Sequence, residues 1–387
     1  MPINSSIFIG YLLICVGFYW LVPKTWRPLF LMACGIIYYA YYSLINLAIL
    51  LFITMITVAI SRFLLRSKQK PIFIIGICSI IFLLVLYKYF NASVQIFSEY
   101  ASSPINIPEI ILPLGFSYLT FECIHLLILS YRREITNLSW ADGLSFLWFF
   151  PARSAGPIKR FPVFFESLTN SINAKYFVYG VLFLVIGFFQ KIVIADSIAS
   201  NTAALNNVES IVSSVDIAIL LCLYSIRIYA DFSGLSHIAI GSSLLFGITV
   251  PKNFSYPYFR SNLAEFWRCW HMSLSSFVRD YIYFPLGGSR VSLFRLSLNL
   301  IVVMFVVGIW HGSSLNFAVW GLYHGFGLVL HRLWATKIGH NIPNGKIRYV
   351  IGMVVTFIFV TFGWVFFATS SLGDSLYLLS VLFGIHA

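Results

Sequence analysis

Charged residues are scarce in this sequence. Asp, Glu, Lys and Arg make up 10% of its 387 residues, whereas hydrophobic residues reach 59% and the mean hydropathy is +0.88. A soluble domain carries about a quarter charged residues, so these few charged side chains could not cover a water-soluble globule of this length. The composition predicts an all-α polytopic membrane protein, and it excludes a disordered chain and a secreted enzyme.

Paired cysteines and common catalytic motifs are also missing. The six cysteines contain no C-x-x-C pair, which excludes a disulfide scaffold and favours packing roles within helices. The sequence has no G-x-S-x-G elbow, no P-loop and no H-E-x-x-H motif. Glu122 and His125 form one Glu-x-x-His, but a carboxylate-bridged di-iron site needs two such motifs. We therefore expect no bound metal or cofactor.

Long apolar runs are abundant instead. A membrane-spanning helix needs about 20 mostly apolar residues, and the sequence predicts ten or eleven such spans. Residues 143–152 are too short to cross and predict a re-entrant or interfacial segment. Without an internal repeat or linker, the chain is interpreted as one membrane domain, 1–387. The predicted spans are 5–22, 28–43, 45–62, 71–90, 110–131, 176–195, 215–247 (tilted, broken or extended), 296–312, 315–334 and 349–368, with a tail at 373–385.

Basic residues indicate the orientation. With the N-terminus outside, every Lys and Arg cluster falls on the inner side, and the outer loops 91–109 and 196–214 contain neither residue. This arrangement follows the positive-inside rule. It explains the net charge of +12 without a nucleic-acid partner. The first span lacks a basic leader and a cleavage site, so we expect it to remain in the protein.

Polar residues inside apolar runs are candidates for function, because they are expensive in lipid. His311 ends one span, and His324 lies in the next beside Gly321 and Gly325, a G-x-x-x-G pair that predicts close helix packing. His331 lies near the inner edge and is interpreted as an interface residue.

Two further features leave alternatives open. Asp231 could orient a histidine or bind a cation, but we expect it to pair with Arg227, four residues back on the same helix face. The segment 265–290 contains His271 among aromatic and charged residues. It could lie on the inner leaflet as a solvated amphipathic helix, or fold into the membrane domain as the floor of a cavity.

These residues carry a resemblance to the membrane-bound O-acyltransferase (MBOAT) family. The sequence is similar to the bacterial branch that includes alginate O-acetylation proteins and the lipoteichoic-acid D-alanyl transfer protein. PLGGSR favours the alginate side. His237 departs from the usual Asp of the branch, and the chain ends at Ala387, sooner than we expect for alginate-type members. The matching pieces are LPLGFSYLTFE (112–122), SAGPIKRF (154–161), IYADFSGLSHIAIG (228–241), the stretch 253–290 and GIWHGSSLNFAVWGLYHG (308–325).

The resemblance implies a helical bundle with N-terminal spans (1–110), a catalytic core (112–334) and C-terminal spans (349–387). It implies that His311 is the catalytic histidine and that His271 is the second histidine of this branch. We expect His311 to act as general base and His271 to orient the thioester or stabilise the oxyanion. The remaining candidates come from the same strings and from the basic side chains of the inner segment 248–295. Supporting residues would be His324, Asp231, Trp310 and Asn316, and donor-binding residues would be Arg268, Arg279 and Lys252.

The implied reaction moves an acyl group, most simply acetyl, from a cytoplasmic CoA or carrier-protein thioester to hydroxyls of an extracytoplasmic glycan. The expected setting is the bacterial cytoplasmic membrane, with an extracytoplasmic acetyltransferase- or esterase-like partner and, for a carrier-bound donor, a small carrier protein. Two alternatives stay open here. One is D-alanyl transfer to teichoic acid, and the other is a solute transporter, which also uses buried polar residues near broken helices.

Overall fold

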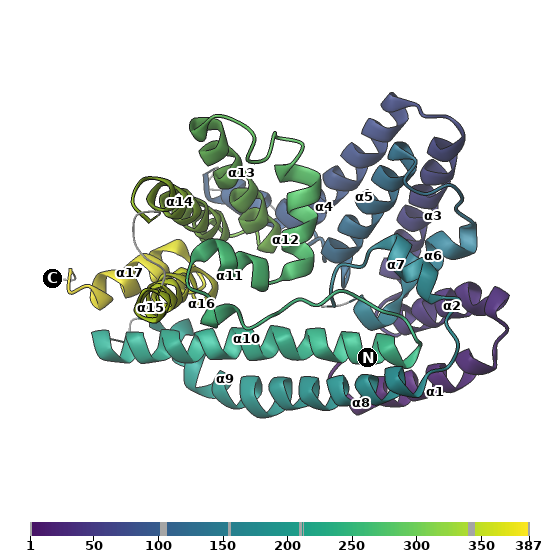
Figure 1. Ribbon diagram of the computed structural model, residues 1–387, viewed down its shortest axis with the longest axis horizontal. Coiled ribbons are helices and arrows are strands. Elements are labelled where there is room, and N and C mark those ends of the chain that lie inside the picture. The colour runs from purple at the N-terminus through teal and green to yellow at the C-terminus, as the bar shows by residue number, and fades with distance from the viewer. Residues whose placement is uncertain are drawn as a thin grey trace. The chain divides into compact units, whose positions relative to one another are not determined.

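The computed structural model describes residues 2–100, 107–153, 156–208, 211, 213–339 and 345–385 (Figure 1). Helices joined by turns and irregular segments make up this part of the chain, and no β-strand occurs within it. The all-α prediction is therefore confirmed. Ser154 and Ala155 of the SAGPIKRF string, part of the loop 91–109, Glu209 and Ala387 lie outside the described residues.

A helix occupies each of the ten predicted spans and the tail. One unbroken helix of 32 residues, Ser214–Leu245, covers the segment 215–247 except for its last two residues, so the broken alternative is wrong. The helices are α1 (Ser6–Leu21), α2 (Arg27–Ala40), α3 (Leu44–Arg66), α4 (Lys70–Tyr100), α5 (Phe116–Arg132), α6 (Trp140–Trp148), α7 (Phe161–Ser167), α8 (Ala174–Phe188), a π-helical turn (Phe189–Ala195), α9 (Asp196–Thr202), α10 (Ser214–Leu245), α11 (Leu263–Cys269), α12 (Met272–Val278), a second π-helical turn (Arg279–Tyr283), α13 (Leu293–His311), α14 (Leu315–Lys337), α15 (Lys346–Gly363), α16 (Val365–Ala368) and α17 (Leu372–Leu382).

Length and composition separate the helices that could cross a membrane from the shorter ones. In the described ranges, five helical stretches are long and apolar enough. α1 and α17 are shorter apolar helices, and the total of ten or eleven crossings stays a prediction. The five stretches are Leu44–Arg66, Lys70–Ser98, Ala174–Leu205, Leu293–His311 and Lys346–Ala368.

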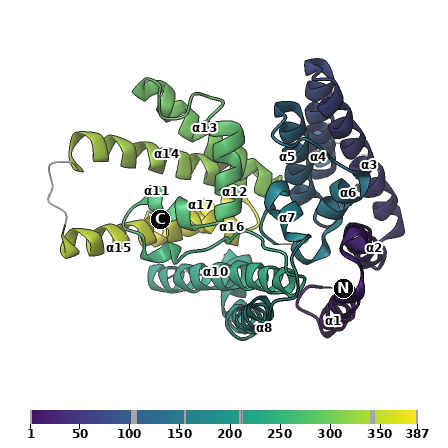
Figure 2. The same ribbon diagram turned by 45° about the vertical axis from the view of Figure 1, so that its right-hand side comes forward.

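The chain forms two compact units: Met1–Phe189 with Gly234–Pro251, and Gln190–Ser233 with Lys252–Ala387. In the first unit, α3, α4 and α5 pack side by side (Figure 2). α6 and the 3₁₀ turn that follows it are buried among these helices and α2, with Trp148 and Phe150 in the core. This burial supports the re-entrant interpretation of residues 143–152, because irregular backbone at membrane depth must be covered by protein.

In the second unit, α13 and α14 form a tightly packed antiparallel pair. A Cβ atom on Gly321 would lie 2.5 Å from the Met304 carbonyl oxygen and 3.2 Å from the Gly308 Cα. A Cβ atom on Gly325 would lie 2.9 Å from the Ile301 Cα. The close approach predicted from the G-x-x-x-G pair is confirmed, and it places His324, between the two glycines, inside the unit.

We expect Gly321→Ala to destabilise the protein. The new methyl group would meet backbone atoms of α13, which cannot rotate aside, and such overpacking costs about 1–3 kcal/mol. Thermal unfolding of the purified protein in detergent measures the change. Gly17→Ala in α1 is the control, because nothing lies within 4 Å of its added Cβ. Equal unfolding temperatures for the two variants would contradict the close packing.

Candidate active site

His271 is held at the junction of α11 and α12. Its backbone has φ +43°, in the left-handed region that non-glycine residues rarely adopt. Its side chain is 1% exposed. The ring packs edge-on against Phe232, with centroids 4.6 Å apart, and Nδ1 lies 3.3 Å from Oδ1 of the buried Asn253. Burial, with a smaller contribution from the charge of His311, holds the pKa of His271 well below its usual range.

The segment 265–290 folds into the second unit. It is divided into α11, α12 and a π-helical turn, and Phe266, Trp270 and Leu274 are buried. The interpretation as one solvated surface helix is therefore wrong. The reason is the aromatic content of the segment, since Trp270 packs on Phe254, Tyr258 and Trp364 instead of facing the inner leaflet.

His311 forms the last turn of α13 and is half-buried. Four aromatic rings surround it: Trp310, Phe317, Trp320 and Phe367, with centroids 4.9–6.5 Å from the imidazole. Trp310 also contacts His271, with centroids 6.3 Å apart. The two histidines that the sequence places 40 residues apart thus share one tryptophan neighbour.

His324 on α14 is completely buried. Trp320 lies 4.8 Å from it and 5.4 Å from His311 between ring centroids, so the third histidine joins the same aromatic cluster. Gly363 leaves room for the ring, because a Cβ there would lie 2.9 Å from Nε2. Among the described residues, neither ring nitrogen has a hydrogen-bond partner. Burying a polar ring without hydrogen-bond partners lowers the stability of the fold. An apolar side chain would fill this position at less cost, so packing alone does not explain why a histidine is present.

The predicted partner of Asp231 is wrong. Asp231 pairs with Lys191 at 2.8 Å, and Lys191 also contacts Asp196 at 2.7 Å. Arg227 instead donates to the Thr202 hydroxyl at 2.8 Å. Lys191 lies in the π-helical turn Phe189–Ala195, between the carboxylates of Asp196 and Asp231, and it contacts both. The ion pair with Lys191 positions Asp231, and no contact between Asp231 and a histidine is described.

The remaining candidate residues are one buried asparagine and three exposed basic side chains. Asn316 is buried at the start of α14, where its Nδ2 donates to the Thr369 carbonyl at 3.1 Å and ties α14 to the end of α16. Lys252, Arg268 and Arg279 are exposed, and Arg279 pairs with Asp280 at 3.0 Å. Their exposure leaves these cations accessible to an anionic group.

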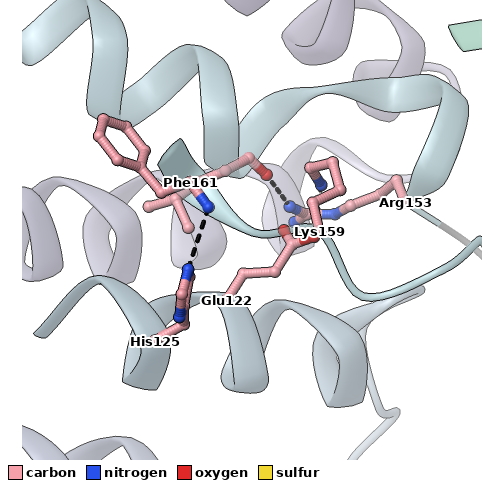
Figure 3. Close-up of polar contacts among 6 residues, drawn as sticks. Glu122, His125, Arg153, Lys159 and Phe161 are labelled. Atoms are coloured by element: carbon pink, nitrogen blue, oxygen red, sulfur yellow. Dashed lines mark hydrogen bonds and ion pairs between the residues drawn. The ribbon is translucent and has the colours of Figure 1, made fainter. Parts of the chain in front are cut away.

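A buried polar cluster in the first unit was missed by sequence reasoning (Figure 3). Lys159, 1% exposed, donates to Glu122, 3% exposed, and the Phe161 amide donates to His125 Nε2 at 3.0 Å. Arg153 donates to the Leu147 carbonyl, and its guanidinium carbon lies 4.8 Å from the Trp148 ring centroid. These contacts engage Glu122 and His125, so the half-motif of the di-iron pattern serves to anchor the loop 156–161.

Long apolar helices, no strand in the described residues, and histidines gathered in an aromatic cluster together define a class, the multi-pass membrane proteins with a polar site inside the helical bundle. The family model described as MBOAT, membrane-bound O-acyltransferase family, matches residues 31–372. The chain therefore belongs to this family and is an O-acyltransferase. The match decides against the solute transporter, and it confirms the resemblance drawn from the sequence strings.

The names of similar proteins agree with the family assignment. The chain is 30% identical to a probable alginate O-acetylase of Pseudomonas aeruginosa over 96% of its own length and 73% of that protein. It is 30% identical to a peptidoglycan O-acetyltransferase of Helicobacter pylori over 95% of its length and 75% of that protein. It is 31% identical to a teichoic acid D-alanyltransferase of Bacillus subtilis, over 66% of its length and 68% of that protein.

Proposed function

We propose that this chain transfers an acetyl group from a cytoplasmic thioester to hydroxyl groups of an extracytoplasmic polysaccharide or cell-wall glycan. The relatives that cover nearly the whole chain carry O-acetylation names, whereas the D-alanyltransferase covers two thirds of it. The observation that carries the proposal is the pairing of a buried His271 with a half-buried His311 across one tryptophan.

In the proposed reaction, His311 takes the proton of the acceptor hydroxyl as the oxygen attacks the thioester carbonyl. The new C–O bond forms, the C–S bond breaks, and the leaving thiolate takes the proton from the His311 imidazolium. Neutral histidine suits this task because its usual pKa lies near neutrality. His311 is half-buried, and an incoming hydroxyl would reach it through the part of its side chain that stays accessible.

The donor would be acetyl-CoA or an acyl-carrier thioester. Lys252, Arg268 and Arg279 are exposed cations that could receive its phosphates or an acidic carrier surface. We place the protein in the bacterial cytoplasmic membrane with its N-terminus outside, on the positive-inside pattern. An extracytoplasmic partner that passes the acetyl group to the glycan fits this arrangement.

Radiolabelled acetyl-CoA tests the proposal. Membranes containing the wild-type protein are expected to move label into polymer or a partner protein, and membranes containing His311→Ala are expected not to. Equal labelling in both would overturn the role of His311. Labelling only from a D-alanyl carrier thioester, and never from acetyl-CoA, would replace the acetyl donor with the alternative.

A further inference from the structure

One side-chain oxygen anchors the loop that carries His271. Asn253 Oδ1 accepts from the Ser273 hydroxyl at 2.6 Å and from the Ser273 amide at 3.3 Å, and it lies 3.3 Å from His271 Nδ1. The Asn253 carbonyl accepts from the Met272 amide at 2.9 Å. Asn253 and Ser273 are both buried. Asn253 therefore contacts three consecutive residues, beginning with the one in the left-handed conformation.

The contact with Ser273 decides which end of the Asn253 amide faces the histidine. A backbone N–H can only donate, so the atom that it meets must be the amide oxygen and not the nitrogen. Asparagine orientation is assigned from such networks. An amide oxygen can only accept, so His271 Nδ1 must carry the proton that fills this contact. The other ring nitrogen, Nε2, then holds a lone pair.

We propose that Asn253 is a positioning residue that holds His271 as the Nδ1–H tautomer and presents Nε2 as a hydrogen-bond acceptor. The inference rests on the proposed function and deepens it. A neutral ring with a lone pair at Nε2 cannot donate a hydrogen bond to an oxyanion from that atom. His271 therefore accepts a hydrogen bond during transfer, while His311 takes the proton, and this replaces the oxyanion-stabilising role expected from the sequence.

Burial supports the neutral ring. His271 is 1% exposed and its closest described ring neighbours, Phe232 and Trp310, bring no charge. An isolated buried charge is unfavourable, and the pKa of His271 is correspondingly low. With a neutral ring, the choice of tautomer alone decides what Nε2 can do, and Asn253 makes that choice. A tautomer fixed by a hydrogen-bonded neighbour is a known determinant of histidine catalysis.

Nitrogen-15 NMR of histidine-labelled protein tests the tautomer without any substrate. The His271 signals are identified by their loss in His271→Gln. We expect the wild type to show a protonated Nδ1 and an unprotonated Nε2. We expect Asn253→Ala to show a mixture of tautomers, and Asn253→Asp, which keeps an acceptor oxygen, to retain the Nδ1–H form. A wild-type His271 protonated at Nε2 would overturn the proposal.

Kinetics test the consequence. We expect Asn253→Ala to lower kcat by about 10- to 100-fold with little change in KM, and Asn253→Asp to restore most of it. The control is Asn299→Ala, which removes a buried asparagine of the same unit whose Nδ2 donates to the Leu286 and Gly288 carbonyls. An unchanged kcat in Asn253→Ala, or an equal loss in Asn299→Ala, would refute a positioning role. Because the NMR result needs no acyl transfer, failure of the proposed function would be seen separately.

Discussion

His311→Ala is expected to lower the rate of acyl transfer by about 10²- to 10⁴-fold, the range that a positioned general base contributes. The variant removes the only group in the proposed reaction that takes the acceptor proton. It leaves the surrounding rings in place, because Trp310, Trp320 and Phe367 also contact one another or other residues of the unit. The loss should therefore appear in catalysis and not in folding.

Initial rates of label transfer at saturating donor measure this effect. His331→Gln is the matched control, since His331 lies on α14 and stacks on Trp334, away from the aromatic cluster. We expect it to keep near wild-type rates. A His311→Ala enzyme with the activity of His331→Gln would show that another group takes the proton. Thermal unfolding in detergent verifies that both variants are folded.

Lys159→Met is expected to destabilise the protein by about 3–5 kcal/mol, the cost of leaving a buried charge without its partner. Glu122 is 3% exposed and would keep its carboxylate in the core without the ammonium that now contacts it. The double variant Glu122→Leu/Lys159→Met removes both charges. We expect it to be more stable than Lys159→Met alone, because a buried pair replaced by apolar residues is often nearly neutral.

Unfolding of the single and double variants in detergent gives the coupling between the two residues. The control is Glu134→Gln, which breaks the exposed pair with Arg132 at 3.5 Å and should cost less than about 1 kcal/mol. A double variant less stable than Lys159→Met would contradict the ion-pair interpretation. Such a result would mean that each side chain contributes through packing of its own.

Hydropathy located the helices because a crossing segment needs a local run of apolar residues. Hydropathy could not show that residues 143–152 are buried in protein, since a lipid-facing segment and a protein-covered one have similar compositions. The G-x-x-x-G prediction succeeded for a related reason. Gly321 packs on α13, the helix directly before it in the chain, so the pattern and its partner are close in sequence.

The ion pairs could not be predicted in this way. Periodicity identifies neighbours on one helix, and it suggested Arg227 for Asp231, but Lys191 comes from a segment 40 residues earlier. Lys159 and Glu122 are likewise 37 residues apart. The basic residues of the inner loops follow a charge rule that says nothing about burial, so Lys159 resembled any other loop lysine. For the candidate site, the sequence supplied the histidines and the strings around them, but not Asn253, whose role depends on the conformation of another loop.

The four aromatic rings around His311 have a consequence for the competition between acyl transfer and hydrolysis. A thioester beside a histidine base is open to attack by any nearby oxygen nucleophile, and water is the most abundant of these. Four rings with centroids 4.9–6.5 Å from the imidazole present mostly apolar surface around it, and apolar surface disfavours ordered water. If the proposed reaction holds, this apolar lining favours transfer of the acetyl group to the acceptor hydroxyl over hydrolysis of the donor.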